Sequence, residues 1–244
     1  MSKPRNIDHI SPSQLILYEN CPYLWYLRYV KSYWPPKSHP LKFGIAFHNG
    51  IETMMNEWDK KEVALANAKS SFDYSYIFEE KGEDPDKWCS KAHEMYQHLS
   101  IGLKKFKSFE PISMEETIQR EKLRGRIDCF AKIDGENFLV DWKSGSYPYN
   151  AERVSNDLQI TAYCWMTENK YKPAFILVTK RSSRFYFYPT ERTKKELLDF
   201  EDYMNSILWQ MENRNTFPKN TEHCSAYGGC TALRDGLCEG RNDF

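Results

Sequence analysis

The chain has 244 residues, of which 41% are hydrophobic and 15% aromatic, a composition that supports a packed core and excludes global disorder. Lysine plus arginine and aspartate plus glutamate each number 34, so the formal net charge is zero. This balance argues against a surface covered in positive charge, although a local basic groove remains compatible with it. The sequence has no run of eighteen apolar residues and no apolar signal-peptide core, so we expect a cytoplasmic protein without a membrane partner.

The first half of the chain shows the apolar spacing of helices. Ser11-Pro12 is a helix-start signal, and proline-rich residues 31–40 form a loop. A second break falls at residues 79–88. The predicted helices are residues 11–30, 41–71 and 87–109.

Beyond residue 110 the pattern changes to that of short strands separated by turns. Asp134-Gly135 is a strong signal for a hairpin between the second and third strands. The predicted strands are residues 114–123, 125–133, 137–143, 173–180 and 184–190, and the predicted helices are residues 151–169 and 191–213. This order indicates one mixed α/β domain over residues 1–244. Its parts are a helical part (11–110), a catalytic part of β-meander, helix and strands (111–190), and a C-terminal helix with a cysteine-rich tail (191–244).

Two acids and a lysine occupy special positions in this outline. Asp128 lies in the second predicted strand and Asp141 ends the third, so the hairpin lets the two carboxylates approach across the ladder. Alternate side chains of a strand share a face, so Lys143 points to the same side as Asp141. Carboxylate oxygens suit Mg²⁺ or Mn²⁺, and His48 on an earlier helix would add an imidazole. Lys143 is fit to orient a water or to stabilise charge on a phosphate.

A second pair of polar residues follows the third strand. Gln159 and Tyr163 are four residues apart on a predicted helix, so both face the same way. Each of these short motifs is common by chance, and a strand-end ion pair is the usual explanation for an isolated Asp-x-Lys. The interpretation therefore depends on the joint pattern.

Four motifs occur in order along the chain: "GIAFH" (44–48), "GRID" (125–128), "DWK" (141–143) and "QITAY" (159–163). In this order they resemble the motifs of RecB-like nucleases of the PD-(D/E)XK superfamily. With the flanking cysteines, the chain resembles most the iron–sulfur branch, which includes the CRISPR-associated RecB-like exonucleases and their phage-encoded relatives. The resemblance spans roughly residues 11–240 and implies a restriction-endonuclease-like core, a central mixed β-sheet flanked by helices.

The resemblance also implies roles for the matched residues. The divalent metal would be bound by His48, Asp128, Asp141 and the main-chain carbonyl of Trp142. Lys143 would assist the attacking water, and Gln159 with Tyr163 would shape the site and contact DNA. Glu116 and Glu121 are both candidates for a further upstream acid. The tryptophan between acid and lysine departs from the smaller or tyrosine-like residue of the family, which should not disturb a carbonyl ligand.

Three of the seven cysteines crowd into the last twenty-one residues, with the spacing C-x5-C-x7-C: Cys224, Cys230 and Cys238. An odd number of cysteines without a signal peptide argues against a disulfide framework. The resemblance supplies Cys21 as a fourth ligand. Four thiolates hold a zinc ion or a 4Fe–4S cluster, and the spacing alone does not choose between them. The resemblance favours iron–sulfur, which would join the N-terminal helices to the C-terminal tail.

These features together predict a divalent-metal-dependent deoxyribonuclease. We expect an exonuclease that hydrolyses phosphodiester bonds at single-stranded or frayed DNA ends, in recombination, repair or phage DNA metabolism. Aromatic residues in "CPYLWYLRY" and "SYWPP" would stack unpaired bases. The alternatives are a DNA-end-binding assembly partner with little cleavage activity, and an enzyme that acts on RNA. Asp128, Asp141 and Lys143 favour the nuclease, because a pure binder has no chemical need for them. Cleavage polarity and oligomeric state stay open.

Overall fold

The computed structural model describes residues 4–76 and 84–240. The chain divides into two units. The first, which we call the sheet unit, contains Lys37–Ile118 and Arg126–Arg192. The second, which we call the terminal unit, contains Met1–Pro36, Gln119–Gly125 and Thr193–Phe244. The single domain expected from the sequence stays a prediction.

A five-stranded mixed sheet forms the middle of the sheet unit, with the described strands in the order β1-β2-β3-β4-β5. Strands β2 and β3 are antiparallel, β3 and β4 parallel, and β4 and β5 antiparallel. A parallel pair needs a crossover connection, and α6 (Ala151–Ser155) and α7 (Leu158–Met166) lie in the chain between β3 and β4. The strands are β1 (Phe109–Arg120), β2 (Leu123–Ile133), β3 (Glu136–Lys143), β4 (Lys172–Val178) and β5 (Phe185–Pro189).

The hairpin predicted at Asp134-Gly135 is confirmed. Both residues have positive φ, 51° and 88°, as a two-residue turn between antiparallel strands requires. The register pairs Cys129 of β2 with Val140 of β3. The same register, carried one residue further, sets Asp128 opposite Asp141.

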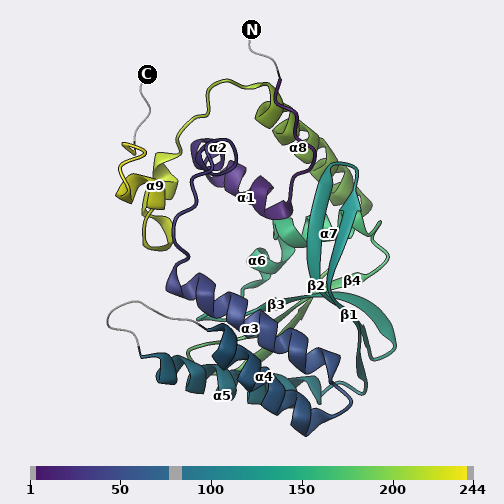
Figure 1. Ribbon diagram of the computed structural model, residues 1–244. Coiled ribbons are helices and arrows are strands. Elements are labelled where there is room, and N and C mark those ends of the chain that lie inside the picture. The colour runs from purple at the N-terminus through teal and green to yellow at the C-terminus, as the bar shows by residue number, and fades with distance from the viewer. Residues whose placement is uncertain (1–3, 77–83, 241–244) are drawn as a thin grey trace. The chain divides into compact units, whose positions relative to one another are not determined.

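Three helices cover one face of the sheet: α3 (His39–Asn56), α4 (Lys61–Ser75) and α5 (Pro85–Leu103) (Figure 1). Aromatic rings fill the space between them. Phe47 stacks on Tyr96 with ring centroids 4.7 Å apart, and Phe43 lies 5.2 Å from Phe72. The same buried cluster continues into the sheet, where it includes Trp142. Helix α3 is therefore held by packing along its length, which fixes the direction of the polar side chains that it carries.

The first predicted helix, residues 11–30, is in fact two helices, α1 (Pro12–Asn20) and α2 (Pro22–Tyr29). Proline disfavours a helical backbone in the residue before it and cannot donate a main-chain hydrogen bond. Cys21 accordingly has an extended backbone, with φ −162° and ψ 104°, and ends one helix while it caps the next.

The other predicted helices also have different bounds, and the one predicted over residues 191–213 begins at Lys194. The helix predicted over residues 41–71 is α3 and α4, and that over residues 151–169 is α6 and α7. The chain breaks between α6 and α7 because the Asp157 carboxylate accepts a hydrogen bond from the Ile160 N–H. This bond caps the first turn of α7 and so starts a new helix. The helix predicted over residues 87–109 ends at Leu103, since β1 begins six residues later. The predicted break at residues 79–88 lies partly outside the described residues.

In the terminal unit, segments from the N-terminal and the C-terminal parts of the chain contact the tip of the β1–β2 hairpin. Ile10 forms a parallel bridge with Leu123 of this tip. Lys122 pairs at 2.8 Å with Glu212 of α8 (Lys194–Asn213), and the ring of Tyr26 stacks on Phe217 at 5.0 Å. The unit also contains the short helices η1 (Thr221–Gly228) and α9 (Thr231–Arg234).

The aromatic residues predicted to stack bases near the N-terminus fall into two classes. Trp25 is 2% exposed and packs at 5.6 Å against Phe217, so it belongs to the core of the terminal unit. Trp34 is 59% exposed and lies edge-on to Tyr29 at 5.2 Å. Only the second kind of ring has a free face for a base, and its role stays a prediction.

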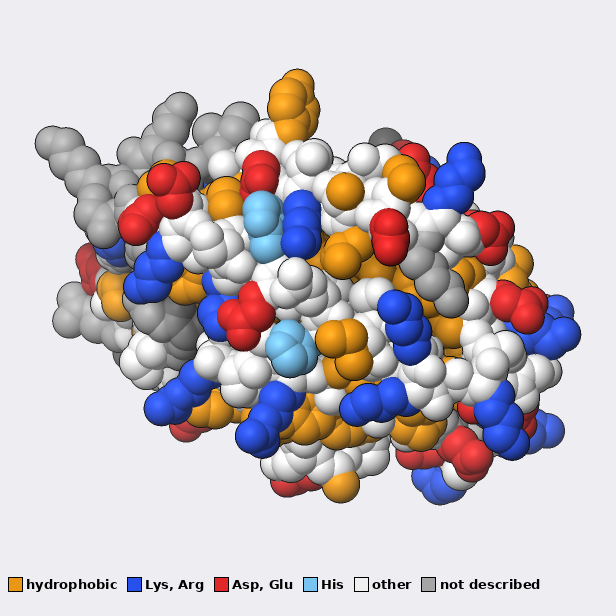
Figure 2. Space-filling view, turned by 90° about the horizontal axis from the view of Figure 1, so that it is seen from below, with side chains coloured by type: hydrophobic (Ala, Val, Ile, Leu, Met, Phe, Trp, Pro, Cys, Tyr) orange, Lys and Arg blue, Asp and Glu red, His pale blue; other side chains and the backbone are white. Residues whose placement is uncertain are grey.

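The charged side chains are mixed on the face seen in Figure 2. Lys and Arg alternate there with Asp, Glu and apolar side chains and form no continuous basic surface. This distribution agrees with the zero net charge of the sequence. Among the described residues, no helix has both the length and the apolar character needed to cross a bilayer.

Two glycines of α3 have different surroundings and test its packing. A Cβ at Gly50 would overlap the Tyr96 hydroxyl and lie 2.8 Å from the carbonyl oxygen of Ala68. We expect Gly50→Ala to lower the free energy of unfolding by about 1–3 kcal/mol, the cost of overpacking a core. A Cβ at Gly44 meets nothing within 4 Å in the described chain, so Gly44→Ala should raise the free energy of unfolding by up to about 1 kcal/mol. Urea denaturation checks both, and equal effects would contradict this packing.

Candidate active site

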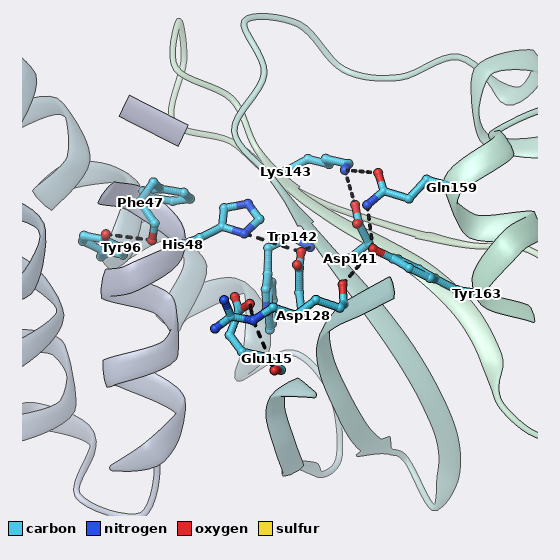
Figure 3. Close-up of polar contacts among 11 residues, drawn as sticks. Phe47, His48, Tyr96, Glu115, Asp128, Asp141, Trp142, Lys143, Gln159 and Tyr163 are labelled. Carbon is cyan, nitrogen blue, oxygen red and sulfur yellow. Dashed lines mark hydrogen bonds and ion pairs between the residues drawn. The ribbon is translucent and has the colours of Figure 1, made fainter. Parts of the chain in front are cut away.

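Two buried carboxylates meet where β2 and β3 pair in the sheet unit (Figure 3). Asp128 is 8% exposed and Asp141 is 1% exposed. The main-chain N–H of Trp142 donates a hydrogen bond to Asp128 Oδ2 at 2.8 Å, which ties the acid of β2 to the backbone of β3. The Trp142 ring is fully buried in the core, as a side chain on the face opposite to Asp141 should be.

His48 reaches the same site from α3. Its Nδ1 lies 3.5 Å from Asp128 Oδ2. Burial lowers the pKa of His48, while Asp141 and a hydrogen bond to the Trp142 main chain act in the opposite direction. The neutral imidazole is therefore the favoured form at neutral pH, and this is the form that ligates metals.

Glu115 of β1 is a site residue that the sequence reasoning missed. Single ligand atoms of Glu115, His48 and Asp128 all lie within 4.8 Å of one another. Arg126 Nε pairs with Glu115 Oε2 at 2.7 Å and also donates to the Glu115 carbonyl at 3.2 Å. These two contacts hold the carboxylate of Glu115 in place beside the histidine and the aspartate.

The two glutamates considered from the sequence have other surroundings. Glu116 accepts a hydrogen bond of 2.5 Å from the Ser113 hydroxyl, and Glu121 lies in the turn that belongs to the terminal unit. Glu115 has a left-handed backbone with φ 52°, which interrupts the two-residue period of the strand. Alternation along β1 therefore offered no signal that would choose Glu115 over its neighbour.

The negative charges of the buried acids are only partly balanced by the protein groups around them. Burial raises the pKa of Asp128, and the charge of Asp141 raises it further. Burial also raises the pKa of Glu115. Asp141 Oδ1 is buried with no hydrogen-bond partner among the described residues, an arrangement that is costly unless a cation or water is bound. Carboxylate oxygens with one imidazole are a donor set that suits Mg²⁺ or Mn²⁺, so the residues fit a divalent metal.

Lys143 is held beside Asp141 by a chain of hydrogen bonds (Figure 3). Its Nζ lies 2.5 Å from Asp141 Oδ2 and donates to Gln159 Oε1 at 3.3 Å. Gln159 Nε2 donates to the Tyr163 hydroxyl at 2.8 Å, and that hydroxyl donates to the Arg126 carbonyl at 2.7 Å. Burial alone would lower the pKa of Lys143, but the nearby aspartates outweigh it and raise the pKa. The lysine is therefore charged and its ammonium is fixed in direction.

The four cysteines singled out in the sequence gather in the terminal unit. All are free thiols: Cys21, Cys224, Cys230 and Cys238. Cys21 is buried with Leu24, Leu27 and Ala232, and Cys230 and Cys238 pack against this cluster. Burial and the charges of the other three sulfurs raise the pKa of Cys224.

The main chain supports this group of sulfurs. The N–H of Gly240 donates to Cys238 Sγ at 3.4 Å, and the N–H of Cys230 donates to the Cys224 carbonyl at 2.8 Å. Soft cysteine sulfurs grouped in this way are ligand types that fit zinc or an iron–sulfur cluster.

A family model of the PD-(D/E)XK nuclease superfamily matches residues 9–240, so the chain belongs to this superfamily. The protein is thus a nuclease of a class that uses divalent metal ions, and its mixed sheet flanked by helices confirms the expected fold class.

Of two similar solved structures, the first supports the fold. A protein from Eubacterium rectale named "Putative exonuclease" aligns with a TM-score of 0.59 and 14% identity, over 94% of this chain and 88% of its own. The protein SSO0001 aligns over 98% of this chain and 89% of its own, with 15% identity and a TM-score of 0.42. No curated protein matches the sequence.

The raised pKa of Asp128 predicts an effect on stability. A carboxyl whose pKa is higher in the folded than in the unfolded protein costs stability as pH rises above its unfolded pKa. In EDTA at pH 7, we therefore expect Asp128→Asn to raise the free energy of unfolding, because the substitution removes a charge that burial and Asp141 destabilise. The gain should vanish near pH 3, where the unfolded and folded forms are both protonated. Exposed Asp59→Asn is the control, and a gain as large in this variant would refute the explanation.

Proposed function

We propose that this protein is a divalent-metal-dependent DNA exonuclease that acts on single-stranded or frayed ends, in recombination, repair or phage DNA metabolism. The observation that carries the proposal is the proximity of three side chains of metal-ligating types, together with a charged lysine fixed beside a buried acid. Membership of the nuclease superfamily supports the hydrolytic reaction. The choice of an exonuclease is supported by the motif resemblance and, by analogy of fold alone, by the E. rectale protein.

Mg²⁺ or Mn²⁺ would be held by His48, Asp128, Asp141 and the main-chain carbonyl of Trp142, and Glu115 would add a further carboxylate. The neutral histidine and the unsatisfied oxygen of Asp141 support this set. When bound, such an ion polarises a phosphoryl oxygen and lowers the pKa of bound water.

The protein's own residues would position the reaction. The Lys143 ammonium would orient the attacking water or stabilise negative charge that develops on the phosphate. The water oxygen bonds to phosphorus, one ester P–O bond breaks, and the leaving oxygen takes a proton. Gln159 and Tyr163 would hold the lysine in direction and border the path of DNA, as their hydrogen bonds support.

The alternative of a DNA-end-binding partner without catalysis is disfavoured by one observation. Burial and mutual repulsion raise the pKa of Asp128, so a protein that only binds DNA ends would carry a destabilising pair of acids without benefit. A nuclease gains a metal site from the same pair.

We further propose that Cys21, Cys224, Cys230 and Cys238 hold a 4Fe–4S cluster. The clustering of these four cysteines in the terminal unit supports a thiolate-bound group. The choice of a 4Fe–4S cluster over a zinc ion rests on the motif resemblance.

Removing the acid or the lysine should separate metal binding from catalysis. We expect Asp141→Ala and Lys143→Ala each to reduce cleavage of end-labelled linear DNA by at least about 100-fold, the scale of losing one preorganised charge. Asp141→Ala should also lose Mn²⁺ binding in calorimetry, whereas Lys143→Ala should keep it.

The matched control is Lys132→Ala, an exposed lysine of β2. This variant should cleave linear DNA at the wild-type rate. Neither the wild type nor any variant should cleave closed circular duplex. If either active-site variant cleaves DNA at the wild-type rate, the assignment of the site is wrong.

The cluster predicts colour and iron. Anaerobically purified protein should be brown, with broad visible absorbance that bleaches on reduction, and should contain about four irons per chain. Replacing any proposed cysteine ligand by alanine should remove the colour and lower the thermal stability. Cys89→Ala, Cys129→Ala and Cys164→Ala should keep the colour. One zinc and no iron by elemental analysis would overturn the cluster.

A further inference from the structure

A hollow of about 630 Å³ lies in the sheet unit, bordered by the start of α5, the segment after β3 and the turn between β4 and β5. Its lining combines cationic and aromatic side chains. We call these residues the basic groove: Lys87, Trp88, Lys91, Tyr147, Lys180 and Arg181.

The basic groove concentrates positive charge. Four cations line it, and the acid among the described lining residues is Glu94, which pairs with Lys91 at 2.6 Å. The lining therefore has a surplus of three positive charges, four minus one, in a chain whose formal net charge is zero. A hollow with such a surplus attracts anions.

Tyr147 gives the groove a flat apolar surface. The residue is 63% exposed. Arg181 Nη1 donates to the Tyr147 hydroxyl at 3.0 Å, and the guanidinium carbon lies 5.6 Å from the ring centroid. The arginine thus steadies the tyrosine while most of the side chain stays open to solvent. An exposed ring among cations is the arrangement that stacks an unpaired base while phosphates are bound nearby.

Trp88 serves a different purpose. Its ring packs at 5.8 Å from Phe43 of α3, and the Lys180 ammonium lies 4.4 Å from the centroid of the same Phe43 ring. These contacts anchor the floor of the groove to the helix that carries His48. The base-stacking role therefore falls to Tyr147.

The groove is continuous in the chain with the catalytic strand. Tyr147 follows Lys143 by four residues, which span at most about 14 Å. The Lys180 N–H donates to the Gly145 carbonyl at 2.7 Å, so the β4–β5 turn is fastened to the segment that leaves β3. A strand bound in the groove is thereby within reach of the site.

We propose that the basic groove holds a single DNA strand next to the catalytic site, with a base stacked on Tyr147 and phosphates bound by Lys87, Lys180 and Arg181. This inference rests on the proposed function, which makes DNA the substrate. In a duplex the base faces are stacked on one another, so Tyr147 selects an unpaired strand.

The test is binding of fluorescein-labelled oligodeoxythymidine, about 20 nucleotides long, in EDTA. Tyr147→Ala should weaken binding about fivefold or more, the effect of losing one stacked base. Arg181→Gln should weaken binding and make the slope of log K against log salt shallower by about one, the effect of losing one phosphate contact. Fluorescence anisotropy over a salt series measures both.

Matched controls remove the same chemistry outside the groove. Tyr74, which is 89% exposed, is replaced by alanine, and exposed Lys105 is replaced by glutamine. Both variants should bind within twofold of the wild type. Groove variants that bind like these controls would overturn the proposal, as would an equal loss of closed-duplex binding in Tyr147→Ala.

The outcome is independent of cleavage, because EDTA removes the metal from the assay. Groove variants that bind like their controls in an active nuclease overturn the groove alone. A wild type that binds the oligonucleotide through Tyr147 and Arg181, yet leaves labelled DNA intact with Mg²⁺ and Mn²⁺, supports the groove and refutes the proposed exonuclease.

Discussion

The register between β2 and β3 is the constraint on which the active site depends. The two-residue turn at Asp134-Gly135 fixes this register and sets Asp128 opposite Asp141. A slip of one residue would send the side chains of one strand to the other face of the sheet. The hydrogen bond from the Trp142 N–H, and the proximity of His48, exist only in this register.

The fold keeps two buried acids close together although their burial and their mutual repulsion are unfavourable. Burial and repulsion raise the pKa of Asp128, and an oxygen of Asp141 lacks a hydrogen-bond partner among the described residues. The packed aromatic core between α3 and the sheet offsets this cost, because the acids lie on elements that are fixed by other contacts. Stability and function are thus supplied by different faces of the same strands.

The sequence predicted those features that depend on local chemistry. The Asp-Gly hairpin, the shared face of Asp141 and Lys143, and the mixed α/β order follow from turn residues and strand period. Glu115 could not be chosen, because its left-handed backbone breaks that period. The break between α3 and α4 was missed because residues 57–60 contain no glycine or proline, so periodicity alone ran the two helices together.

The composition of the two units has a consequence for the order of biosynthesis. The terminal unit is built from the first 36 residues, the hairpin tip and everything from Thr193 onward. It cannot be completed until the residues that follow Thr193 leave the ribosome, whereas the sheet unit is fully synthesised at Arg192. The acids of the active site are therefore synthesised before the three C-terminal cysteines that are proposed to bind the cluster together with Cys21.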